Sequence, residues 1–304
     1  MTAEQRRKNL CPPRPGAHVV LDTDTYNEID DQFALSWQML SPELNTKALY
    51  AAPFFNENST GPEDGMRRSY EEIHKLLGLL GRDAPVFPGS PRYLPDEKSP
   101  VPSPAAEDLA RRAEGYSPEN PLYVAAIGAI TNVASAILLN PRVAENTVVV
   151  WLGGNGRHWP DGREFNLSQD IAAARVVMAS GVPFVQLPCG GVVDRLSTTR
   201  PELEHWLKGK NPLASYLAEN TIQAAESYGK GTAWSRVIWD VSTVAWLLDR
   251  EARMVSTQIV PMCLPGYGHQ YEDGPEGLEM GYVYRVDRDR VFTRMFQCLG
   301  EHSA

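Results

Sequence analysis

The stretch that decides the fold is VVLDTDTYNEIDDQFAL, residues 19–35. Residues 19–21 form an apolar run that indicates a buried strand of a parallel sheet. Residues 32–40, QFALSWQML, have the apolar spacing of a helix. Four aspartates stand between the two: Asp22, Asp24, Asp30 and Asp31. Because ligands bind at the carboxyl ends of the strands in an open α/β sheet, we expect these carboxylates in a binding site.

Carboxylates this close in the chain repel one another, and burying them costs free energy unless a cation or hydrogen-bond donors compensate. A hard divalent cation meets this need, and Ca²⁺ accepts many oxygen ligands in loose geometry. The alternative is a solvated acidic turn in which Asp30 is the N-cap of the helix. We favour a metal site, because Asp22 and Asp24 directly follow a strand that is expected to be buried on both faces.

The chain has 304 residues, 42% of them hydrophobic and 22% charged, which is ordinary for a globular protein. Its net charge of −9 argues against a nucleic-acid partner, since nucleic acids are polyanions. No run approaches the roughly 18 apolar residues of a membrane span, and the N-terminus lacks the apolar core of a signal peptide. The four cysteines have no zinc spacing and predict free thiols in a reducing compartment. We therefore expect a cytoplasmic protein without a membrane partner.

Outward from the acidic stretch, apolar runs alternate with helical patterns up to about residue 190. Runs that predict strands occupy residues 47–55, 121–127, 148–152 and 182–188, and patterns that predict helices occupy residues 65–81, 131–139 and 170–180. This alternation predicts an α/β fold, an open and mostly parallel sheet with helices on both faces. The last third is expected to be more helical. We expect a single domain over residues 1–304, with residues 1–16 as a polar lead-in.

Polar residues follow several of the predicted strands. Asn56 and Asn58 come after the second strand, either as turn formers or as hydrogen-bonding groups for a polyol. Glu164 and Asn166 lie on a polar loop, and Asp240 precedes the apolar helical pattern VSTVAWLL, where an N-cap is the alternative role. The proline-rich residues 91–104 predict a loop long enough to act as a lid.

Five ordered motifs together resemble the inosine-uridine-type nucleoside hydrolases. They are DTD with DD at residues 22–31, IGAITN at 127–132, WLGGNG at 151–156, EFN at 164–166 with a following Asp and AAARVV, and WD at 239–240. Their order and spacing match from about residue 19 to residue 248. The resemblance implies an open α/β fold with a calcium ion at the strand ends. It also implies an enzyme that hydrolyses the N-glycosidic bond of ribonucleosides, giving ribose and the free base.

The resemblance implies which residues would hold the metal. Asp24, Asp31 and Asp240 would bind Ca²⁺ through carboxylate oxygens, and the main-chain carbonyl of Ile127 would complete the protein ligands. Asp24 would also act as the general base that takes a proton from the attacking water.

The resemblance assigns the sugar contacts as well. Asp30, Asn56, Glu164 and Asn166 would bind the ribose, with Asn56 the least secure match because Asn58 is so near. Asp22 would support the site from behind.

Two features depart from the family pattern. The usual tight Pro-Gly turn between the acids is replaced by Thr25–Ile29, which is two residues longer and brings Glu28 toward the pocket. Trp239 stands where many members have the His that protonates the leaving base, and Trp is no acid near neutral pH. We expect its ring to contact the base instead. Glu28, His158 and His269 are candidate acids elsewhere.

Two other functions fit part of the sequence. Residues 21–25, LDTDT, also match the DxDx[TV] signature of haloacid-dehalogenase-type phosphatases, but GGNG stands where those enzymes need an acidic pair after the strand at 148–152. A calcium-dependent nucleoside- or ribose-binding protein with little turnover is the second alternative, because the His is missing. A homo-oligomer is expected from the resemblance, whereas the preference for purine or pyrimidine is left open.

Overall fold

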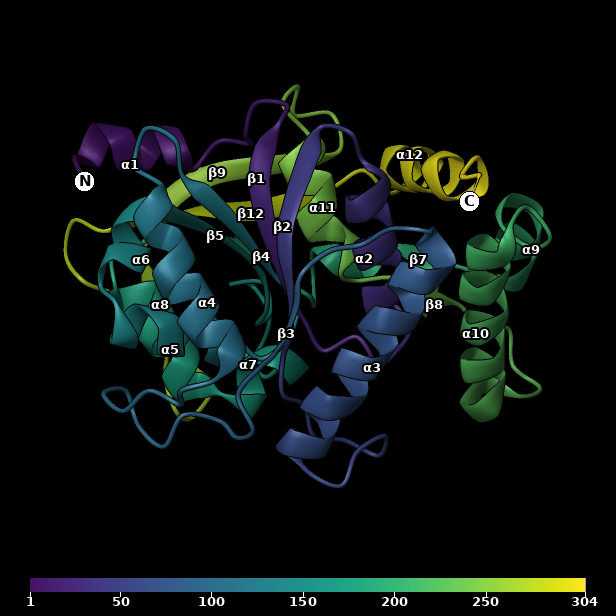
Figure 1. Ribbon diagram of the computed structural model, residues 1–304, viewed down its shortest axis with the longest axis horizontal. Helices are drawn as coiled ribbons and strands as arrows, with labels where there is room; N and C mark the ends of the chain where they lie inside the picture. The colour runs from purple at the N-terminus through teal and green to yellow at the C-terminus, as the bar shows by residue number, and fades with distance from the viewer. Residues whose placement is uncertain (304) are drawn as a thin grey trace.

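An eight-stranded sheet forms the centre of the computed structural model, which describes residues 1–303 (Figure 1). From edge to edge its strands are β3 (Val86–Pro88), β2 (Leu44–Ala51), β1 (Ala17–Thr23), β4 (Leu122–Ala126), β5 (Thr147–Leu152), β6 (Phe184–Leu187), β12 (Glu279–Val286) and β9 (Val255–Pro261). All neighbours are parallel except β12 and β9, which pair antiparallel. The predicted α/β fold with an open, mostly parallel sheet is confirmed.

The strand order reverses at β1. The chain runs outward from β1 to β2 and β3, then returns to place β4 on the other side of β1. In register, Asp22 of β1 lies beside Ala126 of β4, and Thr23 lies beside Ala51 of β2. The segments after these three strands therefore diverge from one point at the carboxyl edge of the sheet, which is where open α/β sheets bind ligands.

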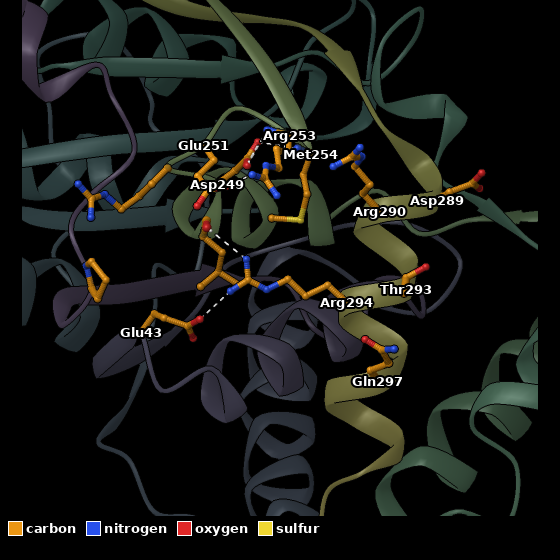
Figure 2. Close-up of a pocket in the computed structure, with 13 residues that line it drawn as sticks. Glu43, Asp249, Glu251, Arg253, Met254, Asp289, Arg290, Thr293, Arg294 and Gln297 are labelled. Atoms are coloured by element: carbon orange, nitrogen blue, oxygen red, sulfur yellow. Dashed lines mark hydrogen bonds and ion pairs between the residues drawn. The ribbon is translucent and has the colours of Figure 1, made fainter.

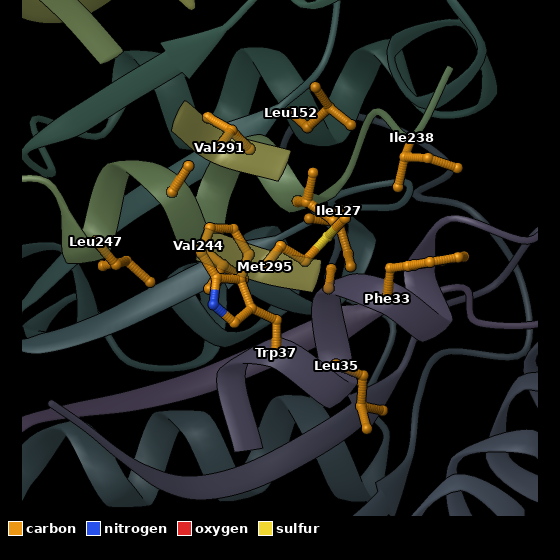
Figure 3. Packing of buried hydrophobic residues seen from close by; sticks show 14 of the residues in the cluster. Phe33, Leu35, Trp37, Ile127, Leu152, Ile238, Val244, Leu247, Val291 and Met295 are labelled. Carbon is orange, nitrogen blue, oxygen red and sulfur yellow. The ribbon is translucent and has the colours of Figure 1, made fainter. Parts of the chain in front are cut away.

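Helices cover both faces of the sheet. One face carries α2 (Asp31–Leu40), α3 (Pro62–Leu80), α11 (Val241–Leu248) and α12 (Arg288–Gly300), and the other carries α4 (Pro104–Arg112), α5 (Thr131–Leu139), α6 (Arg142–Asn146) and α8 (Ile171–Ala179). On the first face, Trp37, Val244 and Met295 pack in one buried cluster (Figure 3). This packing ties the helix after β1 to the helix that begins beside Asp240, so both helix starts are held against the sheet.

Smaller elements complete the chain. They are α1 (Ala3–Asn9), α7 (Phe165–Gln169), α9 (Arg200–Trp206), α10 (Pro212–Gly229), two short 3₁₀ turns (Ala113–Gly115 and Val193–Arg195), and the strand pairs β7 (Ser197–Thr198) with β8 (Arg236–Val237) and β10 (Cys263–Pro265) with β11 (Tyr271–Asp273). The expected polar lead-in thus contains a short helix. The last third does hold four helices, but the expectation missed β12 and β9, which extend the main sheet. Among residues 1–303, no helix has the length and apolar character needed to cross a bilayer.

Candidate active site

Three carboxylates from two distant parts of the chain meet at the carboxyl edge of the sheet. Oxygens of Asp30, Asp31 and Asp240 lie within 4.8 Å of one another, and all three side chains are buried. Asp30 and Asp240 occupy the N-cap positions of α2 and α11, but neither side chain makes a capping hydrogen bond. The alternative of a solvated turn is therefore wrong for Asp30, which is buried, and the two N-cap residues hold their carboxylates toward one another instead of capping their helices.

Asp24 lies beside this cluster. Its side chain is fully buried, and neither carboxylate oxygen has a hydrogen-bond partner within residues 1–303. A Cβ added at Gly128 would lie 2.9 Å from the Asp24 Cγ, so the glycine after β4 leaves the room that this carboxylate occupies. A buried carboxylate without a partner is costly, and such a group calls for a ligand that compensates its charge.

Burial and mutual repulsion raise the pKa values of the clustered acids. Burial is the larger cause for Asp24 and Asp240, and the charges of neighbouring aspartates add to it. The pKa of Asp31 rises to about 8, through burial first and then through the charge of Asp30. Without a cation, the folded protein therefore holds protons here at neutral pH.

Residues of β1 and α5 form hydrogen bonds with aspartates at this edge of the sheet. Thr23 donates a hydrogen bond from its hydroxyl to Asp31 Oδ1, and Asn132 Nδ2 donates to Asp22 Oδ1 over 2.7 Å. The second carboxylate oxygen of Asp22 is buried without a partner among the described residues, and burial raises the pKa of Asp22 to about 7. Asp22 thus lies outside the pocket lining and bonds to Asn132 of α5.

A pocket of 320 Å³ opens beside the cluster, within the size range of small-molecule sites. It is lined by Asn27, Glu28, Asp30, Ile127, Leu152, Asn155, Trp159, Arg163, Glu164, Phe165, Asn166, Cys189, Gly190, Trp239 and Asp240. Six of the residues predicted from the sequence are in this set. Asp22, Asp24, Asp31 and Asn56 lie outside the lining.

Glu164 and Asn166 reach the pocket from the start of α7. Glu164 is the N-cap, and its two oxygens accept hydrogen bonds from the backbone N–H groups of Gly154, Asn166 and Leu167. The Nδ2 of Asn166 donates to the carbonyl oxygens of Ile127 and Leu152, each over 3.1 Å. These bonds fix Glu164 as an acceptor and leave the Asn166 Oδ1 as the acceptor that this side chain can offer a ligand.

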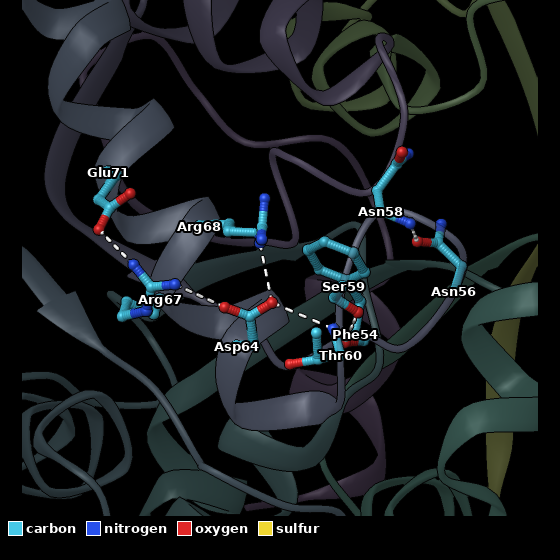
Figure 4. Close-up of polar contacts among 9 residues, drawn as sticks. All are labelled: Phe54, Asn56, Asn58, Ser59, Thr60, Asp64, Arg67, Arg68 and Glu71. Atoms are coloured by element: carbon cyan, nitrogen blue, oxygen red, sulfur yellow. Dashed lines mark hydrogen bonds and ion pairs between the residues drawn. The ribbon is translucent and has the colours of Figure 1, made fainter.

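Asn56 does not line the pocket. Its Nδ2 donates to Asn27 Oδ1 over 2.6 Å. Its Oδ1 accepts the backbone N–H of Asn58 over 2.8 Å, a bond shown in Figure 4. The longer loop at residues 25–29 places Asn27 between Asn56 and the pocket. This arrangement does not test the predicted contact of Asn56 with ribose. It does show that the Asn56 amide is already hydrogen-bonded to Asn27 of the loop.

A larger groove lies elsewhere and contains none of these residues. It has a volume of 880 Å³ between the C-terminal end of α11 and helix α12 (Figure 2). Three of its arginines are paired: Arg294 donates to Glu43 and to the Leu248 carbonyl, Arg253 pairs with Glu251, and Arg290 pairs with Asp287. Within residues 1–303, this groove has no counterpart of the aspartate cluster.

Comparison with known proteins agrees with this geometry. The family described as inosine-uridine preferring nucleoside hydrolase matches residues 19–292. The chain belongs to this family. Pyrimidine-specific ribonucleoside hydrolase RihA of Salmonella paratyphi A is 28% identical over 262 residues, which cover 77% of this chain and 80% of that protein.

Solved structures share the fold at low identity. An Inosine-Guanosine Nucleoside Hydrolase covers 95% of this chain and 99% of its own, with a TM-score of 0.76 and 18% identity. A Purine-Preferring Ribonucleoside Hydrolase from Gardnerella vaginalis covers 93% of this chain and 98% of its own, with a TM-score of 0.72 and 18% identity. The predicted resemblance is confirmed, the chain is an N-ribosyl hydrolase of nucleosides, and the phosphatase alternative is wrong.

The nucleoside hydrolase pocket also contains residues that the sequence did not single out. Trp159 and Arg163 come from the loop after GGNG, and the free thiol of Cys189 lies beside Glu164. Their only signal was proximity in sequence to a predicted strand end. Of the three candidate acids, Glu28 lines the pocket, whereas His158 and His269 are outside its lining.

Proposed function

We propose that this nucleoside hydrolase depends on calcium and cleaves ribonucleosides at the Asp24–Asp30–Asp31–Asp240 cluster. The observation that carries the proposal is the convergence of buried carboxylates that form no ion pair with any Lys, Arg or His among residues 1–303. Uridine and inosine are the first substrates to test, since the similar RihA is named pyrimidine-specific and the family is described as preferring inosine and uridine.

The donor set fits a hard divalent cation. Asp24, Asp31 and Asp240 supply carboxylate oxygens, and the carbonyl of Ile127 retains a second lone pair beyond the bond from Asn166. When bound there, calcium would neutralise the cluster and make a nearby water more acidic. The orphaned oxygens of Asp24 support its place in this set.

The chain's own residues then account for the remaining steps. Asp24 accepts the proton of the attacking water as general base. Asp30, whose Oδ2 is held by the backbone N–H of Trp239 over 3.0 Å, accepts a ribose hydroxyl. As the bond to the base breaks, the sugar carbon becomes oxocarbenium-like, and the surrounding carboxylates stabilise its positive charge. Trp239 offers its ring to the departing base.

The test combines metal removal with a matched pair of variants. Ribose release from uridine and inosine is measured after chelation and after calcium is added back, together with the bound metal. Asp31→Ala should lose metal and activity together. Asp249→Ala is the control, because Asp249 is a buried carboxylate that accepts three backbone N–H bonds away from the cluster. This control should lose thermal stability yet retain bound metal and turnover.

Two results would contradict the proposal. One is ribose release at full rate from protein in which no metal is detected. The other is loss of metal and activity in Asp249→Ala to the same degree as in Asp31→Ala. The cytoplasmic location and the homo-oligomeric state stay predictions, which fractionation and light scattering can check.

A further inference from the structure

The loop between β1 and α2 carries a residue whose role the family pattern does not supply. This loop, residues 25–29, is two residues longer than the usual turn between the acids and places Asn27 at the pocket wall. Asn27 is 8% exposed and lines both the 320 Å³ pocket and an adjoining cavity of 660 Å³.

Four hydrogen bonds fix the position of Asn27. Its backbone N–H donates to the Asp24 carbonyl over 2.6 Å. Its carbonyl oxygen accepts from Asn56 Nδ2 and Asn58 Nδ2, over 3.2 and 2.8 Å. Its Oδ1 accepts from Asn56 Nδ2 over 2.6 Å. So many restraints on one loop residue indicate that its side chain is held in one orientation.

The orientation of the amide follows from the same bonds. Asn56 Oδ1 accepts the backbone N–H of Asn58, so the other end of the Asn56 amide must be the donor (Figure 4). That donor requires an acceptor, which fixes Oδ1 of Asn27 toward Asn56. The Nδ2 of Asn27 is thereby turned the other way, and it has no hydrogen-bond partner within residues 1–303.

The surrounding pocket shows what this donor can bind. The carboxylates of Asp30, Glu164 and Asp240, which line the pocket, are acceptors when ionised. A sugar hydroxyl that donates to one of them still needs a donor for its own oxygen. The amide of Asn27 is such a donor on the same pocket wall as Asp30.

We infer that Asn27 donates from Nδ2 to a ribose hydroxyl of the substrate, and that Asn56 is a positioning residue that holds Asn27. This inference rests on the proposed function and assigns a sugar contact to the extended loop. It gives Asn56 a role through Asn27 in place of the direct contact expected from the resemblance.

The experiment compares kcat/KM for uridine with the 2′-, 3′- and 5′-deoxy analogues. The variants are Asn27→Ala, Asn27→Asp, Asn56→Ala and the Asn27→Ala/Asn56→Ala double variant, with Asn140→Ala as a control outside the pocket. Alanine suits position 27, because its φ is not positive and three backbone bonds remain. Asp at position 27 keeps the acceptor for Asn56 and removes the donor.

Asn27→Ala should lower kcat/KM for uridine about tenfold, the effect of one lost hydrogen bond. The loss should largely vanish with the analogue that lacks the contacted hydroxyl. Asn27→Asp should lose at least as much as Asn27→Ala. Asn56→Ala should have a smaller effect that disappears in the double variant, since it acts through Asn27. Asn140→Ala should match the wild type.

Three outcomes would overturn the inference: unchanged kcat/KM in Asn27→Ala, an equal loss on uridine and all its deoxy analogues, or an Asn56→Ala effect that persists in the double variant. Failure of the proposed function would give a different result: the wild-type protein would hydrolyse no ribonucleoside. In that case ribose binding by calorimetry tests Asn27, and equal affinities for wild type and Asn27→Ala would reject the contact.

Discussion

The Trp239 side chain contacts both the pocket and the hydrophobic core. It lines the pocket beside Asp240, and it also packs against the buried cluster that contains α2 and α11. In the sequence, Trp239 stands where many family members have the acid that protonates the leaving base, and its ring was predicted to contact the base. The structure leaves its ring partly exposed to the pocket, which is the face that a base can meet.

We expect Trp239→Ala to slow nucleosides with poor leaving groups more than a nitrophenyl riboside, whose leaving group needs no help. Stacking of a base on an aromatic ring contributes about 1–3 kcal/mol, so inosine should lose about tenfold or more in kcat. The melting temperature is measured on the same samples. Equal slowing of both substrates together with a much lower melting temperature would make Trp239 a packing residue.

Single residues differ in how far their place in the site could be read from the sequence. Asp24 could be placed at the carboxyl edge because it follows an apolar run typical of a buried parallel strand, and Asp30 and Asp31 because they lie just beyond it. Asp240 was assigned through the resemblance to the family, since its own neighbourhood also fitted an N-cap. Asn27 was not predicted, since its presentation depends on hydrogen bonds from residues 56 and 58, which no local pattern encodes.

At the scale of elements, the 25–29 loop is held at its far end by an ion pair. Glu28 pairs with Arg236 of β8, and Arg236 also donates to Tyr228 at the end of α10. The charge of Arg236 also lowers the pKa of Asp30, against the larger effect of burial, which raises it. The loop is therefore tied to segments more than 190 residues away.

We expect Arg236→Gln to lower kcat/KM for uridine about tenfold while bound metal is retained, because the mostly buried Arg236 side chain can no longer pair with Glu28 and the loop loosens. Arg200→Gln is the matched control, since its pair with Glu226 lies on the surface. If Arg236→Gln lost its bound metal, the arginine would be acting on metal binding and not on the position of the loop. An unchanged kcat/KM would show that the ion pair does not govern the loop.

The elements themselves were predicted unevenly. β4 and β5 are nearly continuous apolar runs, and β1, β2 and β6 contain shorter ones, which mark burial on both faces. β9 is an edge strand with exposed positions such as Gln258 and Ile259, and β12 carries exposed residues at Tyr284 and Arg285. Mixed exposure of this kind gives no continuous apolar run, so the antiparallel edge of the sheet escaped the sequence pattern.

For the whole molecule, the acidic cluster couples metal binding and the protonation of its aspartates to the free energy of unfolding. An aspartate in the unfolded chain has a pKa of about 4, whereas burial raises the pKa of Asp22 to about 7 and that of Asp31 to about 8. Between these values the metal-free folded protein binds more protons than the unfolded chain. The contribution of these aspartates to the free energy of unfolding therefore falls as the pH rises from about 4 to about 8.

Calcium should reverse this trend, because it binds the ionised carboxylates that high pH produces. We expect calcium to raise the melting temperature more at pH 8 than at pH 5.5, by about 5 °C at a hundredfold excess over its dissociation constant at pH 8. Differential scanning calorimetry of chelated and calcium-loaded protein measures the shift, with Asp31→Ala as the control that should show none. An equal shift at both pH values would mean that the cation binds away from these aspartates, since only a site built from groups that titrate in this window couples metal binding to pH.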